Sequence, residues 1–266
     1  MKPHAEVDSD FPQVGEILDG PARDTEGPLP LRAVLTRPVV VSVANYGMIS
    51  LLEIITGTLL PLVWSTSVEL GGLSMSPVSI GLWTTGSGIM NCIFQVVAFP
   101  PIVRRFGPRR VFISCIVLTV PVYILFPFEN LAIRHSGTGL NTTAVLLIVL
   151  QLLMMAFSIM GFGEFLGPEP FRCAMSLKHR DEGTIFMYIS SSAPNKRSLG
   201  ATNGIAQTVV SIQRMVGPAA AASLFAFSLD NNILGGNFVY VVLLGIVCVG
   251  LGVALQLPRN MWKHNQ

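Results

Sequence analysis

The sequence predicts an all-α membrane protein with six transmembrane helices, and three observations carry that prediction. Hydrophobic residues make up 51% of the 266 residues and charged residues only 12%, about half the usual share in a soluble domain. The mean hydropathy is +0.60. The apolar residues gather into six long runs, and the rest of the chain offers too little polar surface to cover them in a soluble protein. The net charge of +2 gives no reason to expect a nucleic-acid partner.

Each apolar run can be compared with the ~20 residues that a helix needs to cross a hydrocarbon core ~30 Å thick. The first two runs are long, and Glu53 is the only charge in either of them. The third is shorter, contains Pro121 and Pro127, and is expected to end at Phe128. The fifth is interrupted by Arg214. The predicted spans are residues 39–63, 78–103, 111–128, 144–163, 205–229 and 238–257.

Lysine and arginine are concentrated in alternate connections between these spans. From Arg32 onward, thirteen of them lie just before the first span, between spans two and three, between spans four and five, and after the sixth. The opposite loops contain only Arg134, together with Glu69, Glu129 and Asp230. Short basic loops stay in the cytoplasm. We therefore expect both termini in the cytoplasm, and Glu69, Glu129, Arg134 and Asp230 in loops on the far side.

The segments outside the spans define the domain organisation. Residues 1–31 contain seven of the 15 acidic residues and five prolines, and are predicted to be a disordered cytoplasmic tail or linker. Residues 32–262 form the six-helix part, and 263–266 are a short cytoplasmic tail. Residues 164–183 carry seven charges and interrupt an otherwise apolar segment. We interpret them as a polar insertion, either a retained intron or a genuine cytoplasmic loop.

Two ionisable residues, Glu53 and Arg214, lie near the middle of predicted spans. A charged group at that depth is costly and often marks a substrate or proton pathway. A carboxyl in a low dielectric suits the binding and release of a proton or a cationic substrate, and an arginine can hold an anion or Glu53 itself. Each residue also has a structural interpretation, which is a bond to a neighbouring helix or, for Arg214, snorkelling to the cytoplasmic face.

Neutral polar residues accompany these two at helical spacing. Asn91 and Gln95 are four apart, and Gln207, Ser211 and Arg214 follow at intervals of four and three, so each set shares a helix face. Such a face points at a cavity or at another helix. The predicted substrate or proton pathway comprises Glu53, Arg214, Asn91, Gln95, Gln207 and Ser211.

Glycine and proline give the fifth span a special geometry. Gly217-Pro218 is predicted to break the helical hydrogen-bond ladder and kink the helix. Gly204 and Gly217 are both expected to allow another helix to approach closely.

Signatures of other chemistry are missing from the sequence. The four cysteines lack metal-ligand spacing, so we expect no metal and no cofactor. The sequence contains no HExxH, GxSxG, P-loop or paired-carboxylate motif, and we therefore expect no enzymatic activity.

Two segments resemble a known family. Residues 192–204 read SAPNKRSLGATNG and are followed by Gln207, Ser211, Arg214 and Gly217-Pro218. This pattern resembles the eleventh helix of major facilitator superfamily transporters, closest to the fungal drug:proton antiporters and the zinc-induced-facilitator-like proteins. Residues 104–110, RRFGPRR, resemble the cytoplasmic loop motif of that superfamily, with Arg105, Gly107 and Arg109 at motif positions. Arg104 stands where the motif has an acid, so the role of that acid does not carry over.

The resemblance implies a fold similar to helices 7–12 of a twelve-helix transporter, with an N-terminal six-helix half as partner. It implies transport of a small molecule or ion across a lipid bilayer, coupled to protons as in an antiporter. The alternative is a non-transporting fragment, or a gene-model truncation of such a transporter. The sequence leaves the substrate open, as well as the choice between the plasma and the vacuolar membrane.

Overall fold

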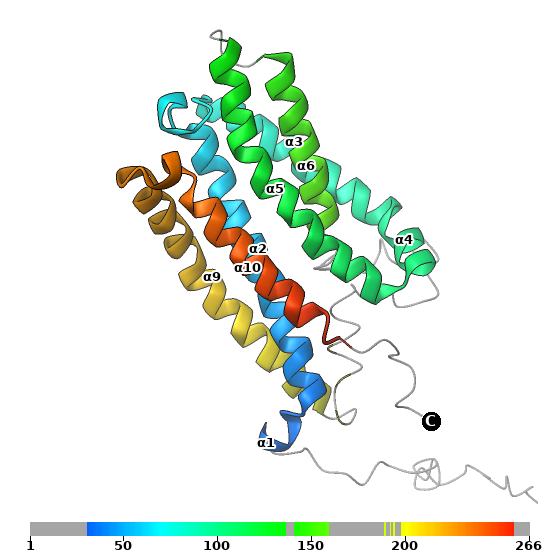
Figure 1. Ribbon diagram of the computed structural model, residues 1–266. Coiled ribbons are helices and arrows are strands. Elements are labelled where there is room, and N and C mark those ends of the chain that lie inside the picture. Colours follow the sequence, from blue (N-terminus) through cyan, green and yellow to red (C-terminus); the bar gives the residue numbers. More distant parts are fainter. Residues whose placement is uncertain are drawn as a thin grey trace, which may run out of the picture.

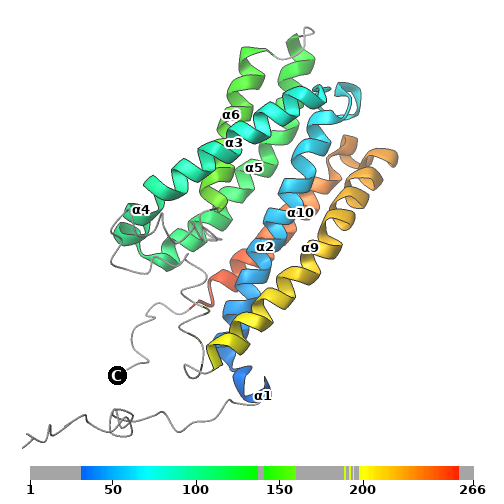
Figure 2. The same cartoon turned by 180° about the vertical axis from the view of Figure 1, so that it is seen from behind.

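The structure is a bundle of long α-helices, which confirms the all-α fold class (Figures 1 and 2). The computed structural model describes residues 31–136, 141–159, 189, 192, 194 and 198–257, and this part contains no strand. Its main helices are α2 (Arg37–Ser65), α3 (Pro77–Val97), α4 (Phe99–Phe106), α5 (Pro108–Ser136), α6 (Thr142–Ile159), α9 (Leu199–Asp230) and α10 (Phe238–Ala254). Three short elements complete it, namely α1 (Leu31–Val34), η2 (Val68–Leu70) and η4 (Ile233–Gly236). Residues 1–30 of the predicted tail (1–31), the insertion at 164–183 and residues 263–266 lie outside the described residues.

Five of the described helices are long and apolar enough to cross a membrane: α2, α3, α5, α6 and α9. The sixth predicted span forms α10, which has 17 residues and is about 26 Å long at the usual rise per residue. Successive long helices alternate in direction, and the arginine-bearing α1 and α4 lie at the same end of the bundle as the end of α10 (Figure 1). This common end is the one that the distribution of basic residues assigns to the cytoplasm.

The predicted second span is divided into two helices. Helix α3 ends at Val97, and α4 begins at Phe99 with prolines in its first turn, where a missing N–H costs no helical hydrogen bond. The chain then reverses into α5 at Gly107, whose φ of +80° favours glycine. The long apolar run is therefore helical over almost its whole length, with one break at Ala98 near its end.

The predicted boundary of the third span was wrong. Helix α5 continues for 29 residues through both Pro121 and Pro127, and it includes Glu129 and Arg134, which we expected in a loop. Proline is tolerated inside a helix of a membrane bundle because neighbouring helices can satisfy the freed backbone groups. Glu129 is fully buried rather than exposed to solvent.

Helices α2, α5 and α10 form the centre of the bundle, and α3 lies at its edge. The largest fully buried side chains include Trp64 and Tyr46 of α2 and Tyr123 of α5. Helix α3 has no buried residue at all. Apolar side chains such as Val78, Leu82 and Ile89 face outward from the described bundle, whereas Ile80, Trp83 and Met90 pack against the core.

Hydrogen bonds between side chains and backbone join the central helices. Thr56 of α2 and Tyr123 of α5 share a hydrogen bond of 2.8 Å between their hydroxyl oxygens. The Asn45 amide donates to the Val253 carbonyl of α10 at 3.3 Å. The Gln151 amide of α6 donates to the Val122 carbonyl of α5 at 3.0 Å. Interhelical bonds of this kind contribute about 0.6 kcal/mol each on average within membranes.

Candidate functional site

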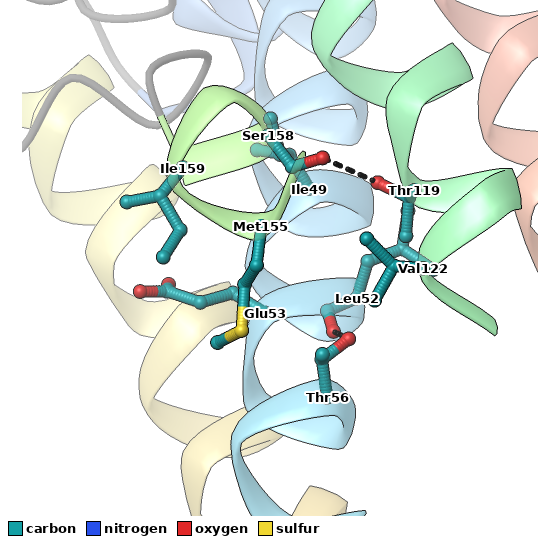
Figure 3. A pocket seen from close by; sticks show the side chains of 9 residues that line it. All are labelled: Ile49, Leu52, Glu53, Thr56, Thr119, Val122, Met155, Ser158 and Ile159. Carbon is teal, nitrogen blue, oxygen red and sulfur yellow. Dashed lines mark hydrogen bonds between the residues drawn. The ribbon is translucent and has the colours of Figure 1, made fainter. Parts of the chain in front are cut away.

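Glu53 lines a small cavity that α2, α5 and α6 form together (Figure 3). The cavity volume is about 30 Å³, which suits a water molecule rather than an organic solute. Its lining residues are Ile49, Leu52, Glu53, Thr56, Thr119, Val122, Met155, Ser158 and Ile159. Glu53 itself is half-buried. The central acid on α2 therefore has access to a confined space of the size that a proton pathway needs.

A pair of hydroxyl groups lies opposite Glu53 in this cavity. Thr119 donates to Ser158 at 3.3 Å, and Ser158 donates to the Cys115 carbonyl at 3.1 Å. The Glu53 carboxyl group points away from this pair in Figure 3. The sequence prediction did not include Thr119 or Ser158, because each is a single small hydroxyl residue in an apolar run and only the contact between α5 and α6 brings them together.

Arg214 lies on an exposed face of α9 and is not among the residues that line the Glu53 cavity. The two residues are nevertheless at a similar depth. Ile54 lies next to Glu53 in sequence and lies against Gly217, one helical turn beyond Arg214. Depth along the bundle was thus predicted from sequence, but the orientation of the two side chains was not.

The neutral polar residues separate into three places. Gln207 donates its amide to the hydroxyl of buried Tyr46 at 3.2 Å, so it joins α9 to α2. Ser211 is exposed on α9. Gln95 donates to Asn91 at 3.3 Å, which confirms that these two share a face of α3, but neither lines a described cavity with Glu53. The structure therefore does not gather the six predicted residues in one pocket of the described chain.

A larger groove, which the sequence prediction missed, lies between α3 and α6. Its volume is about 400 Å³, within the range of small-molecule sites. The lining residues are Ser79, Leu82, Trp83, Gly86, Ser87, Met90, Val149 and Leu152. Small residues one turn after Trp83 on the same face of α3 were the available signal, since Gly86 and Ser87 leave room beside a large ring.

Pro218, Gly217 and Gly204 have different effects on helix α9 and on its packing. Helix α9 runs without interruption from Leu199 to Asp230, so Pro218 removes one N–H but does not end the helix. Gly217 is buried, and a Cβ atom built on it would lie 2.9 Å from Cγ2 of Ile54. Gly204 is exposed with nothing within 4 Å of such an atom, so its predicted role in close packing was wrong.

The residues of the predicted cytoplasmic loop motif have separate structural roles. Gly107 permits the turn between α4 and α5. Arg109 donates from Nε to the Leu257 carbonyl and from a terminal nitrogen to the Leu255 carbonyl, both at 2.9 Å. Carbonyls at a helix C-terminus lack intrahelical partners, and a guanidinium stabilises them. Arg105 lies with its guanidinium carbon 5.8 Å from the centre of the Phe106 ring.

Similarity to known proteins extends over most of the chain. The major facilitator-type transporter psiT2 of Psilocybe cyanescens is 26% identical over 246 residues, which are 87% of this chain and 42% of that protein. The chain is similar to major facilitator superfamily transporters. The multidrug transporter mfsB of Aspergillus fumigatus is 24% identical over 80% of this chain and 32% of its own length. Protein ZINC INDUCED FACILITATOR 1 of Arabidopsis thaliana is 27% identical over 73% of this chain and 35% of its own length.

These similarities confirm the resemblance to the major facilitator superfamily, with fungal and zinc-induced-facilitator proteins among the relatives. No family model matches the chain, and no solved structure matches it. The chain spans from about a third to about two fifths of the length of these curated relatives. With its apolar helices, the chain is an all-α, multi-pass integral membrane protein that is similar to major facilitators. Its correspondence to helices 7–12 stays a prediction.

Proposed function

We propose that this chain forms part of a proton-coupled secondary transporter for a small solute. The observation that carries the proposal is the position of Glu53, a half-buried acid in the middle of α2 that borders a water-sized cavity. An ionisable side chain is rarely retained at this depth without a functional reason. The similarity to transporters of the major facilitator superfamily supports the same conclusion.

Glu53 would bind and release the coupling proton. The ionised carboxyl is disfavoured in a confined apolar setting, and water in the cavity lowers that cost, so both forms are accessible to it. Thr56, Thr119 and Ser158 supply hydroxyl groups that can hold such a water. Arg214, which lies at a similar depth on α9, would set the charge of the pathway, with Gln207 and Ser211 on the same helix as hydrogen-bonding groups.

The groove between α3 and α6 is a candidate binding surface for the solute. Its volume suits a small organic molecule, and the Trp83 ring and the Met90 side chain offer an apolar surface with two serine hydroxyls nearby. Asn91 and Gln95 continue along the same helix, α3, toward its C-terminal end. This arrangement favours a solute with an apolar or aromatic body over a sugar or a simple ion.

A second six-helix half would cover the outward face of α3. This helix has no buried residue, and Val78, Leu82 and Ile89 are between 60% and 72% exposed. In major facilitators the substrate site lies between two halves. Disulfide cross-linking between a cysteine at Ile89 and cysteines placed one at a time along a helix of the second half tests this. Contact between the helices would give a cross-linked product at specific positions, and contact with lipid alone would give none.

Substitution of Glu53 by glutamine tests the proton-coupled function. Membrane vesicles that contain the complete transporter are given a pH gradient, and its solute-dependent collapse is followed with an apolar aromatic dye as the solute. We expect Glu53→Gln to abolish the collapse at normal protein level. Glu69→Gln is the matched control, because Glu69 is an exposed acid in η2. Unchanged coupling in the Glu53 variant would refute the proposal.

A double variant tests whether Arg214 acts with Glu53. If the two residues interact, Arg214→Ala strands a charge, and Glu53→Gln added to it restores protein level. If the losses in the single variants simply add, the residues are independent, and Arg214 acts as a separate anion or solute contact.

A further inference from the structure

Glu129 is a second ionisable residue inside the bundle, and it has no part in the Glu53 cavity. It lies in the C-terminal third of α5, toward the end opposite the arginine-rich α4. Its side chain is 0% exposed, and neither carboxyl oxygen has a hydrogen-bond partner among the described residues. An acid that is completely buried and unpartnered is unusual, since buried polar groups are nearly always hydrogen-bonded.

Aromatic side chains surround this carboxyl. The indole of Trp64, at the end of α2, lies beside it, although its N–H makes no hydrogen bond of good geometry. Tyr240, in the first turn of α10, is its electrostatic neighbour. The Tyr240 ring stacks on Phe126 with centroids 5.4 Å apart. Glu129 thus lies where the ends of three helices meet, out of contact with the solvent.

The elements packed against this end of α5 supply no cation for Glu129. Beyond Glu53, the outer part of α2 has no titratable side chain, all of α6 has none, and α10 contributes only Tyr240 near this end. Glu69 of η2 is an acid. Arg134, on α5 itself, directs its guanidinium to the carbonyls of Val68 and Glu69 at 2.8–3.1 Å.

Complete burial without a neighbouring cation strongly disfavours the ionised form of this carboxyl group. Transfer of an isolated carboxylate into a low dielectric is so costly that the group takes up a proton instead. As a neutral acid, Glu129 has one O–H donor and needs much less solvation. The adjacent Asn130 donates from one amide nitrogen to the carbonyls of Val68 at 2.9 Å and Gly72 at 2.7 Å. These two hydrogen bonds hold the loop between α2 and α3 against the same stretch of α5.

We propose that Glu129 is a proton-binding site separate from Glu53, which holds one proton at neutral pH and, as a neutral acid, allows the adjoining ends of α2 and α10 to pack against α5. Ionisation of Glu129 would place a charge between Trp64 and Tyr240, draw water into this junction and loosen it. The site is a built-in pH-sensitive packing junction at the end of the bundle away from α4. It does not depend on the proposed transport function.

Infrared difference spectroscopy of the purified protein tests the protonation state directly. A protonated carboxylic acid has a C=O stretching band well separated from the bands of a carboxylate. We expect the spectrum of Glu129→Gln at neutral pH to lack one protonated-acid band of the wild type. The control Glu69→Gln, which changes an exposed side chain, should retain that protonated-acid band. Loss of carboxylate bands in the Glu129 variant would overturn the proposal. Glu129→Met gives the same comparison if the amide is not tolerated.

The pH dependence of stability provides a second measurement. A group that binds its proton in the folded state but not in the unfolded state lowers stability as the pH rises, by up to tenfold in the unfolding equilibrium constant for each pH unit. We expect the midpoint of thermal unfolding of the wild type to fall between mildly acidic and alkaline pH. Glu129→Gln should flatten this fall, and Glu69→Gln should retain it. A wild-type profile in Glu129→Gln would overturn the proposal.

Discussion

Substitution of Gly217 by alanine tests the closest contact between α2 and α9, the helices that carry Glu53 and Arg214. The added Cβ would lie 2.9 Å from Cγ2 of Ile54, closer than carbon atoms pack. Ile54 has a β-branched side chain in a helix and has essentially one favoured rotamer, so its methyl group cannot easily move away. The two helices must therefore separate, or the side chain must leave its rotamer.

Three effects determine the expected change in stability, of which the first two destabilise the protein and the third stabilises it. Overpacking costs about 1–3 kcal/mol. Pro218 follows directly, and its ring disfavours the helical conformation of a preceding residue that has a Cβ. Alanine in place of glycine in a helix returns about 1 kcal/mol. We expect a net loss of about 1–2 kcal/mol for Gly217→Ala, which lowers the unfolding midpoint by about 2–8 °C.

Gly204→Ala is the matched control on the same helix. No atom lies within 4 Å of its added Cβ, so only the helix-propensity gain of up to about 1 kcal/mol remains. Thermal unfolding of both variants in detergent, followed by tryptophan fluorescence, measures the difference. Ile54→Ala added to Gly217→Ala should recover part of the loss, with a coupling of about 0.5–3 kcal/mol. Equal midpoints for the two glycine variants would refute the close contact.

Three further predictions concern the hydrogen bonds between helices and the membrane topology. Arg109→Ala should lower the unfolding midpoint and speed proteolysis at the end of α10, because it removes two hydrogen bonds worth about 1 kcal/mol each. The control Arg110→Ala removes an exposed side chain and should have neither effect. Tyr123→Phe should cost about 1 kcal/mol in thermal stability through its bond to Thr56, and no loss would show that this bond is not stabilising. In a cysteine-free background, cysteines at Asp230 and Arg110 should label from opposite sides of the membrane, and labelling from one side would contradict the alternating topology.

Much of the fold was predictable from the sequence because a bilayer imposes local rules. A backbone in hydrocarbon must satisfy its hydrogen bonds internally, so long apolar runs become helices whatever their neighbours. Five such runs form helices long enough to cross a membrane, and a sixth forms the shorter α10. The placement of arginines at one end of the bundle likewise follows from the sequence alone, through the charge rule that orients short loops.

The position of Glu129 could not be predicted from local sequence patterns. An acid after two prolines is typical of a loop at the membrane surface, and the sequence around it contains no sign of its neighbours. Only the packing of Trp64 and Tyr240 from two other helices buries it. The same holds for Thr119 and Ser158, which border the cavity of Glu53 but lie far from it in sequence.

The sequence by itself determined the helices, their apolar character, the alternation of basic connections and the depth of Glu53 and Arg214, since each depends on residues close together in the chain. The tertiary structure decided which face each helix turns inward. It separated Gly217, pressed against Ile54, from Gly204, which contacts nothing. It also placed Asn91 and Gln95 away from the Glu53 cavity and closed a junction of three helix ends over Glu129. The physical reason is that lipid and protein interiors are both apolar, so hydrophobicity alone cannot indicate which of them a side chain faces.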